Sequence, residues 1–180
     1  MNITVFGSSS PHPGDAAYEE ARHLGELIAG AGHTVLTGGY TGTMEAVSRG
    51  AAEAGGLTIG VTCDEIEAWR RGRANQWVRE ERRFPTLRER MYFLIESCDA
   101  ALALPGGIGT LAEIAVMWSG MQSRSMPPRP LVLIGEGWQN TFETLLSSQD
   151  GHIPREHRDL LSFAADVGAG LALLQGKLNL

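Results

Sequence analysis

The chain has 180 residues, of which 43% are hydrophobic and 20% charged, and it carries a net charge of −6 at pH 7. These values are typical of one globular domain built around a single core, and the acidic balance argues against general binding to nucleic acids. No apolar run approaches the roughly 18 residues of a membrane-spanning helix, and residues 2–6 read as a strand, so we expect no membrane segment and no signal peptide. The two cysteines, Cys63 and Cys98, have no partner spacing, which predicts reduced thiols in a cytoplasmic protein.

Strands and helices alternate through the first third of the chain, with glycines between them. We predict strands over Asn2–Phe6, His33–Leu36 and Leu57–Val61. A second helix is expected over about residues 44–54, and a first one, capped by Asp15, has inward apolar residues at Ala17, Ala21, Leu24 and Ile28. A repeated order of strand, glycine loop and helix is typical of parallel strands joined by right-handed crossovers.

This alternation of strands, glycine loops and helices is interrupted between residues 63 and 84. Eight of the fourteen arginines lie between residues 70 and 90, interleaved with Trp77 and three glutamates and preceded directly by Trp69. Such a segment can be a nucleic-acid patch, a solvated helix or the edge of a pocket for an anionic ligand. The net negative charge of the chain favours the last two interpretations.

A helix is predicted to begin at Thr86-Leu-Arg-Glu89, which has the pattern of a capping box. Its inward face is expected to carry apolar side chains, namely Leu87, Met91, Leu94 and Cys98. Arg90 borders this face. The spacing allows Arg90 either to point along the edge of the core toward the end of the sheet or to lie in solvent.

The most informative stretch is a short apolar strand, Ala100–Leu104, that runs through a glycine turn into a helix. Such a turn leaves backbone N–H groups unpaired at the positive end of the helix dipole, which makes a cradle for an anion, most often a phosphate. The alternative is an ordinary turn in which Thr110 and Glu113 form a capping box. Glycine at 106, 107 and 109 exceeds what a turn requires and favours the ligand site.

In the last third we predict strands over Leu131–Ile134 and about Leu160–Ala164, and a final helix over Val167–Leu174 followed by a frayed tail. A helix between these strands, Trp138–Leu146, is expected to turn Phe142, Leu145 and Leu146 inward. The whole chain, residues 1–180, therefore predicts a single-domain α/β fold with an open, doubly wound parallel sheet of the Rossmann-like type. Ligands bind such sheets at the carboxyl ends of the strands, where three loops should converge: Gly7–Ser10, Thr37–Thr43 and Pro105–Thr110.

Several chemistries have little support in the sequence. It contains neither the G-x-G-x-x-G fingerprint of dinucleotide sites nor the G-K-[ST] of nucleoside triphosphate sites, so a mononucleotide or a sugar phosphate suits the loops better. The histidines lack metal-ligand spacing, and the nucleophile elbow of serine hydrolases is absent. The single lysine, Lys177, lies in the expected tail, which argues against pyridoxal phosphate. We expect neither a metal nor a cofactor.

The stretch Pro105-Gly-Gly-Ile-Gly-Thr-Leu-Ala-Glu113 resembles the P-G-G-x-G-T-x-x-E motif of the Lonely Guy (LOG) family, often mislabelled lysine decarboxylases. Residues 5–9 resemble the first strand and loop of that family, and residues 38–44 its second glycine loop. Arg90, nine residues before Asp99, falls on the catalytic arginine of the family. The resemblance covers nearly the whole chain.

This resemblance implies a Rossmann-like enzyme, usually dimeric, that hydrolyses the N-glycosidic bond of a nucleoside 5′-monophosphate, such as AMP or a cytokinin riboside monophosphate, to the free base and ribose 5-phosphate. Arg90 and Glu113 would be the catalytic pair. We expect Glu113 to be ionised, because it is predicted in a first helical turn near Arg90. We expect a homodimer or a tetramer, with no nucleic-acid or membrane partner. The residues expected to hold the phosphorylated ligand are Gly106, Gly107, Gly109, Thr110, Gly7, Ser8, Ser9, Gly38, Gly39, Gly42 and Thr43.

The sequence departs from the family pattern at two places. Met91 follows the arginine where the family commonly has lysine, and Thr43-Met-Glu45 stands where many members have Gly-Leu-Met-Gly. A branch of the same superfamily is similar to molybdenum-cofactor carrier proteins, which bind a phosphorylated pterin without turnover. The alternative function is therefore a non-catalytic carrier or sensor of a phosphorylated ligand. A carrier needs the cradle but not the pair of Arg90 and Glu113.

Overall fold

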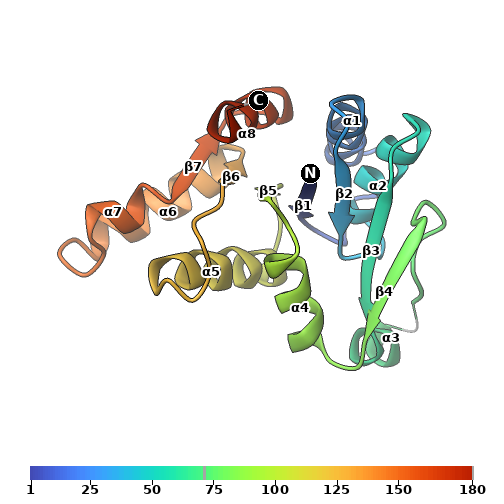
Figure 1. The fold of residues 1–180 in the computed structure, drawn as a ribbon, viewed down its shortest axis with the longest axis horizontal. Helices are drawn as coiled ribbons and strands as arrows, with labels where there is room; N and C mark the ends of the chain where they lie inside the picture. Colours follow the sequence, from blue (N-terminus) through green and yellow to red (C-terminus); the bar gives the residue numbers. More distant parts are fainter. Residues whose placement is uncertain (71, 180) are drawn as a thin grey trace.

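The computed structural model describes residues 1–70 and 72–179. Within them lies one seven-stranded sheet of parallel strands in the order β4-β3-β2-β1-β5-β6-β7 (Figure 1). The strands are β1 Asn2–Phe6, β2 Thr34–Thr37, β3 Thr58–Cys63, β4 Glu80–Phe84, β5 Ala100–Ala103, β6 Leu131–Ile134 and β7 Leu161–Ala164. The helices are α1 Ala16–Gly30, α2 Thr43–Glu53, α3 Asp64–Arg70, α4 Leu87–Glu96, α5 Ile108–Gln122, α6 Glu136–Ser148, α7 Arg155–Arg158 and α8 Val167–Leu178.

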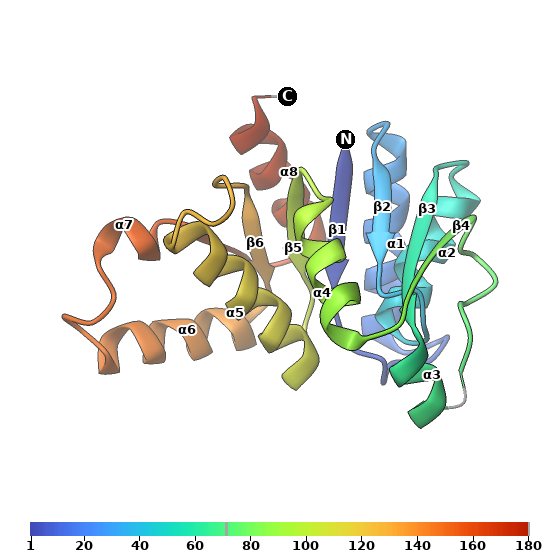
Figure 2. The ribbon, with the colours of Figure 1, turned by 60° about the horizontal axis from the view of Figure 1, so that its bottom comes forward.

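Helices cover both faces of the sheet, which confirms the predicted doubly wound α/β fold. Helices α1, α2 and α8 pack on one face, where Ile3, Val35 and Leu102 belong to one buried cluster (Figure 2). Helices α4, α5 and α6 pack on the other, against a second cluster that contains Phe6 and Ala103. Strands β1 and β5 contribute to both clusters because successive side chains of a strand point to opposite faces. The strand order reverses direction between them, so the switch point of the fold lies there.

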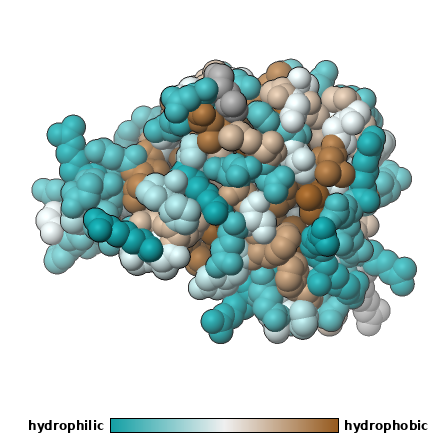
Figure 3. Space-filling view, viewed as in Figure 1, coloured by the Kyte–Doolittle hydropathy of each residue, from teal (hydrophilic) through white to brown (hydrophobic). Residues whose placement is uncertain are grey.

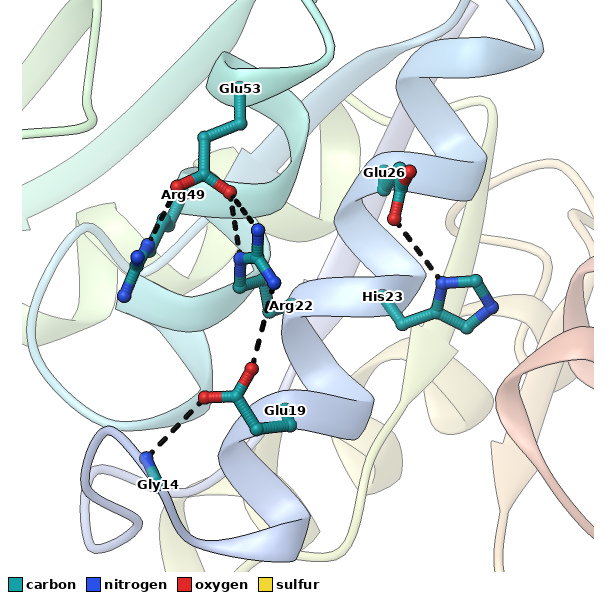
Figure 4. A network of polar contacts seen from close by, with 7 residues as sticks. All are labelled: Gly14, Glu19, Arg22, His23, Glu26, Arg49 and Glu53. Atoms are coloured by element: carbon teal, nitrogen blue, oxygen red, sulfur yellow. Dashed lines mark hydrogen bonds and ion pairs between the residues drawn. The ribbon is translucent and has the colours of Figure 1, made fainter.

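Helices α1 and α2 approach each other closely because each has a glycine at the contact. A Cβ on Gly25 or on Gly50 would collide with the backbone of the facing helix. At the solvent side of this contact, Glu53 of α2 accepts hydrogen bonds from Nε of Arg22 at 2.7 Å and from Nε of Arg49 at 2.9 Å (Figure 4). This packing fixes α2, whose first residue, Thr43, follows the second glycine loop.

Strand β4 was not predicted, because its sequence, Glu-Glu-Arg-Arg-Phe, lacks the apolar alternation of a half-buried strand. It forms one edge of the sheet and pairs with β3. Its charges are paired: Nε of Arg83 lies 2.7 Å from Oδ1 of Asp64, and Nη2 lies 2.7 Å from Oε2 of Glu67. A charged edge strand resists pairing with further chains. The charged composition that prevented the prediction of β4 therefore suits its position at the edge of the sheet.

Several helix faces differ from the prediction. In α1 the buried residues include Tyr18, whereas Ala17 is exposed, and Asp15 precedes the helix without a side-chain capping bond. In α4 the capping box of Thr86 is confirmed, but Leu87 lies outside with 47% of its surface exposed. Leu145 of α6 is likewise exposed, and Trp138 and Phe142 form the buried face.

The carboxyl-terminal part of the chain extends the sheet. Helix α8 continues to Leu178, beyond the predicted end at Leu174. Helices α6 and α7 reach away from the sheet (Figure 1), and hydrophilic residues cover that end of the molecule (Figure 3). Among the residues described, no helix has both the length and the apolar composition required to cross a bilayer.

Candidate active site

Three glycine- or serine-rich loops meet at one edge of the sheet, as predicted. Strand β1 lies between β2 and β5 and pairs with both in parallel, so the loops that follow these strands open on the same side. Helix α5 begins at that edge (Figure 2). We name the loops by order: loop 1 is residues 7–10, loop 2 is residues 38–42 and loop 3 is residues 105–107.

Loops 1 and 2 are joined to each other directly. The backbone N–H of Thr43 donates to the carbonyl of Ser8 at 2.8 Å, and its hydroxyl donates to the same oxygen at 3.1 Å. Gly42 has a φ of +76°, and a Cβ there would collide with the Ser8 carbonyl and lie 2.5 Å from Cα of Ser9. A second close approach is at Gly7, where a Cβ would collide with Oγ1 of Thr43. These glycines therefore allow the two loops to touch.

Replacing Gly42 by alanine should destabilise the protein by more than its positive φ alone explains. The matched control is Gly14→Ala, because Gly14 has a φ of +97° and a Cβ there would meet no atom within 4 Å. We expect Gly14→Ala to cost about 1–2 kcal/mol and Gly42→Ala to cost about 1–3 kcal/mol more, because backbone atoms of loop 1 must move. Urea unfolding at pH 7 measures both losses. Equal losses would contradict a tight contact between the loops.

Loop 3 and the start of α5 remain open to solvent. A Cβ on Gly107 or on Gly109 would meet no atom within 4 Å, and both glycines are exposed. Gly107 is the N-cap residue of α5 and makes no side-chain capping bond. The first N–H groups of a helix have no partner within the helix, and those of α5 lie in this exposed stretch, a position at which phosphate is commonly bound.

The predicted alternative for this stretch, a capping box of Thr110 and Glu113, is wrong. The helix begins at Ile108, so Thr110 is its third residue and Glu113 its sixth, in the second turn. Thr110 is buried, and its hydroxyl occupies the place that a Cβ on Gly106 would take. Gly106 is therefore required for packing within the turn, whereas Gly107 and Gly109 leave space outside it.

Arg90 points inward from α4 to the edge of the sheet, which settles the choice that the sequence left open. Its Nε donates to the carbonyl of Val61 at 2.7 Å, and its Nη2 donates to that of Gly38 at 3.1 Å. Its Nη1 lies 3.8 Å from Oε1 of Glu113. A Cβ on Gly38 would collide with Nη2, so this glycine makes room for the guanidinium.

Glu113 is the partner of Arg90, and 13% of its side chain is exposed. Burial raises its pKa to about 7, while the positive charge of Arg90 acts in the opposite direction. The spacing predicts Glu113 in a first helical turn, with that turn and Arg90 both favouring the ionised form. The carboxyl does face Arg90, but it lies in the second turn, and burial opposes its ionisation more strongly than Arg90 favours it. Near neutral pH both protonation states of this carboxyl are populated, as a proton-transferring group requires.

Two residues that sequence reasoning missed support loop 2. The hydroxyl of Tyr40 accepts a hydrogen bond from the N–H of Cys63 at 2.8 Å and donates to the carbonyl of Cys63 at 3.1 Å. Asn75 donates from Nδ2 to the carbonyls of Gly39 at 3.0 Å and of Tyr40 at 2.9 Å. Asparagine within an arginine-rich stretch carried no signal in the sequence.

The arginine-rich stretch runs through several elements: residues 72–79 are a connection without helix or strand, β4 follows it, and Arg88 and Arg90 belong to α4. Residues 72–79, which we call the strap, cross loop 2 through Asn75. Beside it, the guanidinium of Arg49 lies 5.4 Å from the centre of the Trp77 ring, and Arg79 donates to the carbonyl of Ala52 at 3.4 Å. The strap therefore connects loop 2 and the first residue of β3, Thr58, to α2. Arg71 lies outside the described residues.

The predicted ligand residues fall into three groups by exposure. Those of loop 3, Gly106, Gly107 and Gly109, are exposed, while Gly7, Ser8 and Ser9 are half-buried. The residues predicted in and after loop 2, together with Thr110, are buried: Gly38, Gly39, Gly42 and Thr43. Contact of any of these residues with a ligand stays a prediction.

Comparison with known proteins identifies the family of the chain. The model of the SLOG cluster4 family matches residues 1–125. A rice protein (Oryza sativa subsp. japonica) named probable cytokinin riboside 5′-monophosphate phosphoribohydrolase LOGL9 is 30% identical over 170 residues, which are 92% of this chain and 73% of that protein.

Solved structures show the same fold. The molybdenum cofactor carrier protein of Chlamydomonas reinhardtii aligns with a TM-score of 0.75 and 28% identity, over 99% of this chain and 98% of that one. The molybdenum cofactor binding protein of Rippkaea orientalis aligns with a TM-score of 0.77 and 24% identity, over 98% and 96% of the two chains. The resemblance inferred from the glycine motif is thus confirmed, and the chain belongs to the SLOG cluster4 family.

Proposed function

We propose that the protein hydrolyses the N-glycosidic bond of a nucleoside 5′-monophosphate, releasing the free base and ribose 5-phosphate. The observation that carries the proposal is the buried ion pair of Arg90 and Glu113 on the same edge as the open glycine cradle of loop 3. The name of the rice relative supports the same reaction. The substrates proposed are AMP and cytokinin riboside monophosphates.

The chain's own residues supply two parts of this chemistry. The N–H groups at the start of α5 bind the 5′-phosphate and so orient the ribose. The ionised carboxylate of Glu113 stabilises the positive charge that develops on the ribose, and it takes a proton from the attacking water. The hydroxyl of that water adds to C1′ as the C1′–N bond breaks, and the electron pair of this bond leaves with the base, which takes up a proton. Arg90 holds the carboxylate and keeps part of its population ionised.

The first test is incubation with AMP and other nucleoside monophosphates, with the free base measured by chromatography. Adenosine is the matched control, because it has the same glycosidic bond without the phosphate. We expect base release from at least one monophosphate and much slower release from its nucleoside. No release from any monophosphate would contradict the proposal.

The second candidate is a carrier of a phosphorylated ligand. The alignment of the Chlamydomonas reinhardtii carrier protein over 99% of this chain favours it, and the cradle alone would serve this role. Equilibrium binding of molybdopterin distinguishes the two functions. Tight binding without any base release from nucleotides identifies a carrier, whereas the retained pair of Arg90 and Glu113 leads us to expect hydrolysis.

We further propose that two copies associate through the outer face of α5. Over Ile108–Gln122 the one charged residue is Glu113, and the outward residues Ile108, Ala112 and Ala115 are exposed. The resemblance to the LOG family, whose members are usually dimers, supports the same state. We expect the mass of a dimer in light scattering and of a monomer after Ala115→Arg. Ala17→Arg, at an exposed alanine of α1, is the control and should leave the mass unchanged. A wild-type protein with the mass of a monomer would contradict the proposal. The mass of a tetramer would require a second interface.

A further inference from the structure

The side chain of Tyr40 lies between the end of β3 and the guanidinium of Arg90. The Cζ atom of Arg90 is 5.6 Å from the centre of the Tyr40 ring, within the range of a cation–π contact. Tyr40 is 5% exposed, so this contact is shielded from water. Among the groups around Arg90, this ring touches the guanidinium without forming a hydrogen bond to it.

The polar contacts of Arg90 do not fix the tilt of its guanidinium plane. Nε and Nη2 donate to the carbonyls of Val61 and Gly38, which lie on β3 and in loop 2. Nη1 faces Glu113 at 3.8 Å, which is longer than a hydrogen bond. Two hydrogen bonds on one side of a planar group still allow tilting, and a flat aromatic surface restricts it.

Tyr40 is itself held at both ends, so it can act as a fixed surface. Its hydroxyl makes two hydrogen bonds with the backbone of Cys63, at 2.8 and 3.1 Å. Its backbone carbonyl accepts from Nδ2 of Asn75 in the strap at 2.9 Å. The same β3 strand thus carries both the anchor of Tyr40 and one acceptor of Arg90.

From this arrangement we propose that Tyr40 is a positioning residue, which fixes the plane of the Arg90 guanidinium so that Nη1 faces Glu113. It acts through Arg90 and makes no contact with the reacting atoms. The proposal rests on the proposed function only for its kinetic consequence, because the effect on the Glu113 carboxyl exists with or without catalysis.

The test compares Tyr40→Leu, Tyr40→Phe and a matched control on the helix that carries Arg90. Tyr92 of α4 is 42% exposed, and the guanidinium of Arg88 lies 5.9 Å from its ring, so Tyr92→Leu removes an arginine–tyrosine contact away from the site. The titration of the Glu113 carboxyl is followed by NMR in protein labelled with ¹³C at the glutamate carboxyl groups, and Glu113→Gln assigns the signal. Arg90→Met removes the cation entirely and so gives the largest shift of the Glu113 titration that its loss can cause.

We expect Tyr40→Leu to move the Glu113 titration upward, part of the way to the value in Arg90→Met, because the cation is no longer held beside the carboxyl. Tyr40→Phe keeps the ring but loses its hydroxyl anchor, so its titration should shift clearly less than that of Tyr40→Leu, and Tyr92→Leu should not change the titration. If the enzyme hydrolyses nucleotides, Tyr40→Leu should lower kcat several-fold with little change in KM and should shift the pH profile in the same direction as the NMR titration.

An unchanged Glu113 titration in folded Tyr40→Leu would overturn the proposal, as would an equal shift in Tyr40→Phe. If Tyr40→Leu does not fold, Tyr40→Met fills the same space without an aromatic face and carries the same expectations. The NMR result stands apart from the proposed function: a wild-type protein without hydrolase activity would refute that function, while the titration would still decide the role of Tyr40.

Discussion

Replacing Glu113 by glutamine is expected to lower the rate of nucleotide hydrolysis by about 10²–10⁴-fold, the range typical of a lost acid–base group. Glutamine keeps the size of the side chain and a hydrogen-bond acceptor near Arg90, but it carries no negative charge and takes no proton from water. The proposed phosphate site consists of backbone N–H groups of α5, which this substitution does not remove. We therefore expect kcat to fall while the dissociation constant for AMP, measured by calorimetry on the variant, stays within a few-fold of the wild-type KM.

The matched control for this variant is Glu136→Gln. Glu136 is an exposed acid in the first turn of α6, which follows β6 at the same edge of the sheet. The same change of charge is thus made near the loops but outside the ion pair, and we expect a rate close to wild type. A Glu113→Gln protein that hydrolyses AMP at the wild-type rate would remove the catalytic assignment of this residue.

The pH dependence of the reaction should report the carboxyl of Glu113 directly. Because the ionised form takes the proton from water, kcat/KM for AMP should rise with pH through an apparent pKa of about 7, the value to which burial raises this group. Arg90 lowers that pKa, so Arg90→Met should move the rising limb to higher pH as well as reduce the rate. A profile that falls through pH 7 would mean that protonated Glu113 acts as an acid, which contradicts the role proposed here.

The stability of the protein should change with pH in the opposite direction. The pKa of Glu113 is higher in the folded protein, at about 7, than its ordinary value of 4.5, so the folded state binds the proton more tightly. The contribution of this group to the free energy of unfolding is then fully favourable below about pH 4.5 and is lost as the pH rises to about 7, by on the order of 3 kcal/mol. Urea unfolding between pH 5 and about 8 measures this slope, and Glu113→Gln should reduce it while Glu136→Gln should not.

The order of strands, glycine loops and helices could be predicted because each leaves a local pattern. Strand β1, whose bounds match the prediction, has β-branched residues that end at a glycine, and loop 3 has glycines at a spacing that few other structures need. Strand β4 could not be predicted, because the charged side chain of Arg83 is paired with Asp64 and Glu67, which come from an earlier part of the chain. An alternation of apolar and polar residues indicates a strand with one buried face. An edge strand with paired charges buries little surface and lacks that alternation.

The candidate site could be predicted from the sequence only in part, for a related reason. The motif identified Glu113, and the wider family resemblance identified Arg90. Helical spacing left the direction of Arg90 open, because the carbonyls that fix it belong to β3 and loop 2. The protonation of Glu113 depends on how much water the fold removes from it, which no local pattern records. Tyr40 and Asn75 act through contacts with distant residues: Tyr40 lies in the second glycine loop, but its bond to Cys63 leaves no local pattern, and Asn75 lies outside the stretches that resemble the family.

The position of β1 at the centre of the sheet has a consequence for biosynthesis. Its partner on one side is β2, whose residues follow soon after it, but its partner on the other side is β5, where Ile3 pairs with Ala100. Until β5 has emerged from the ribosome, β1 can pair with β2 only. One edge of this central strand therefore stays unpaired. Such an edge is prone to wrong pairing, and long-range parallel pairing is slow. Glu113 follows β5 in the chain, so products of translation that end before it lack both this pairing and the acidic partner of Arg90.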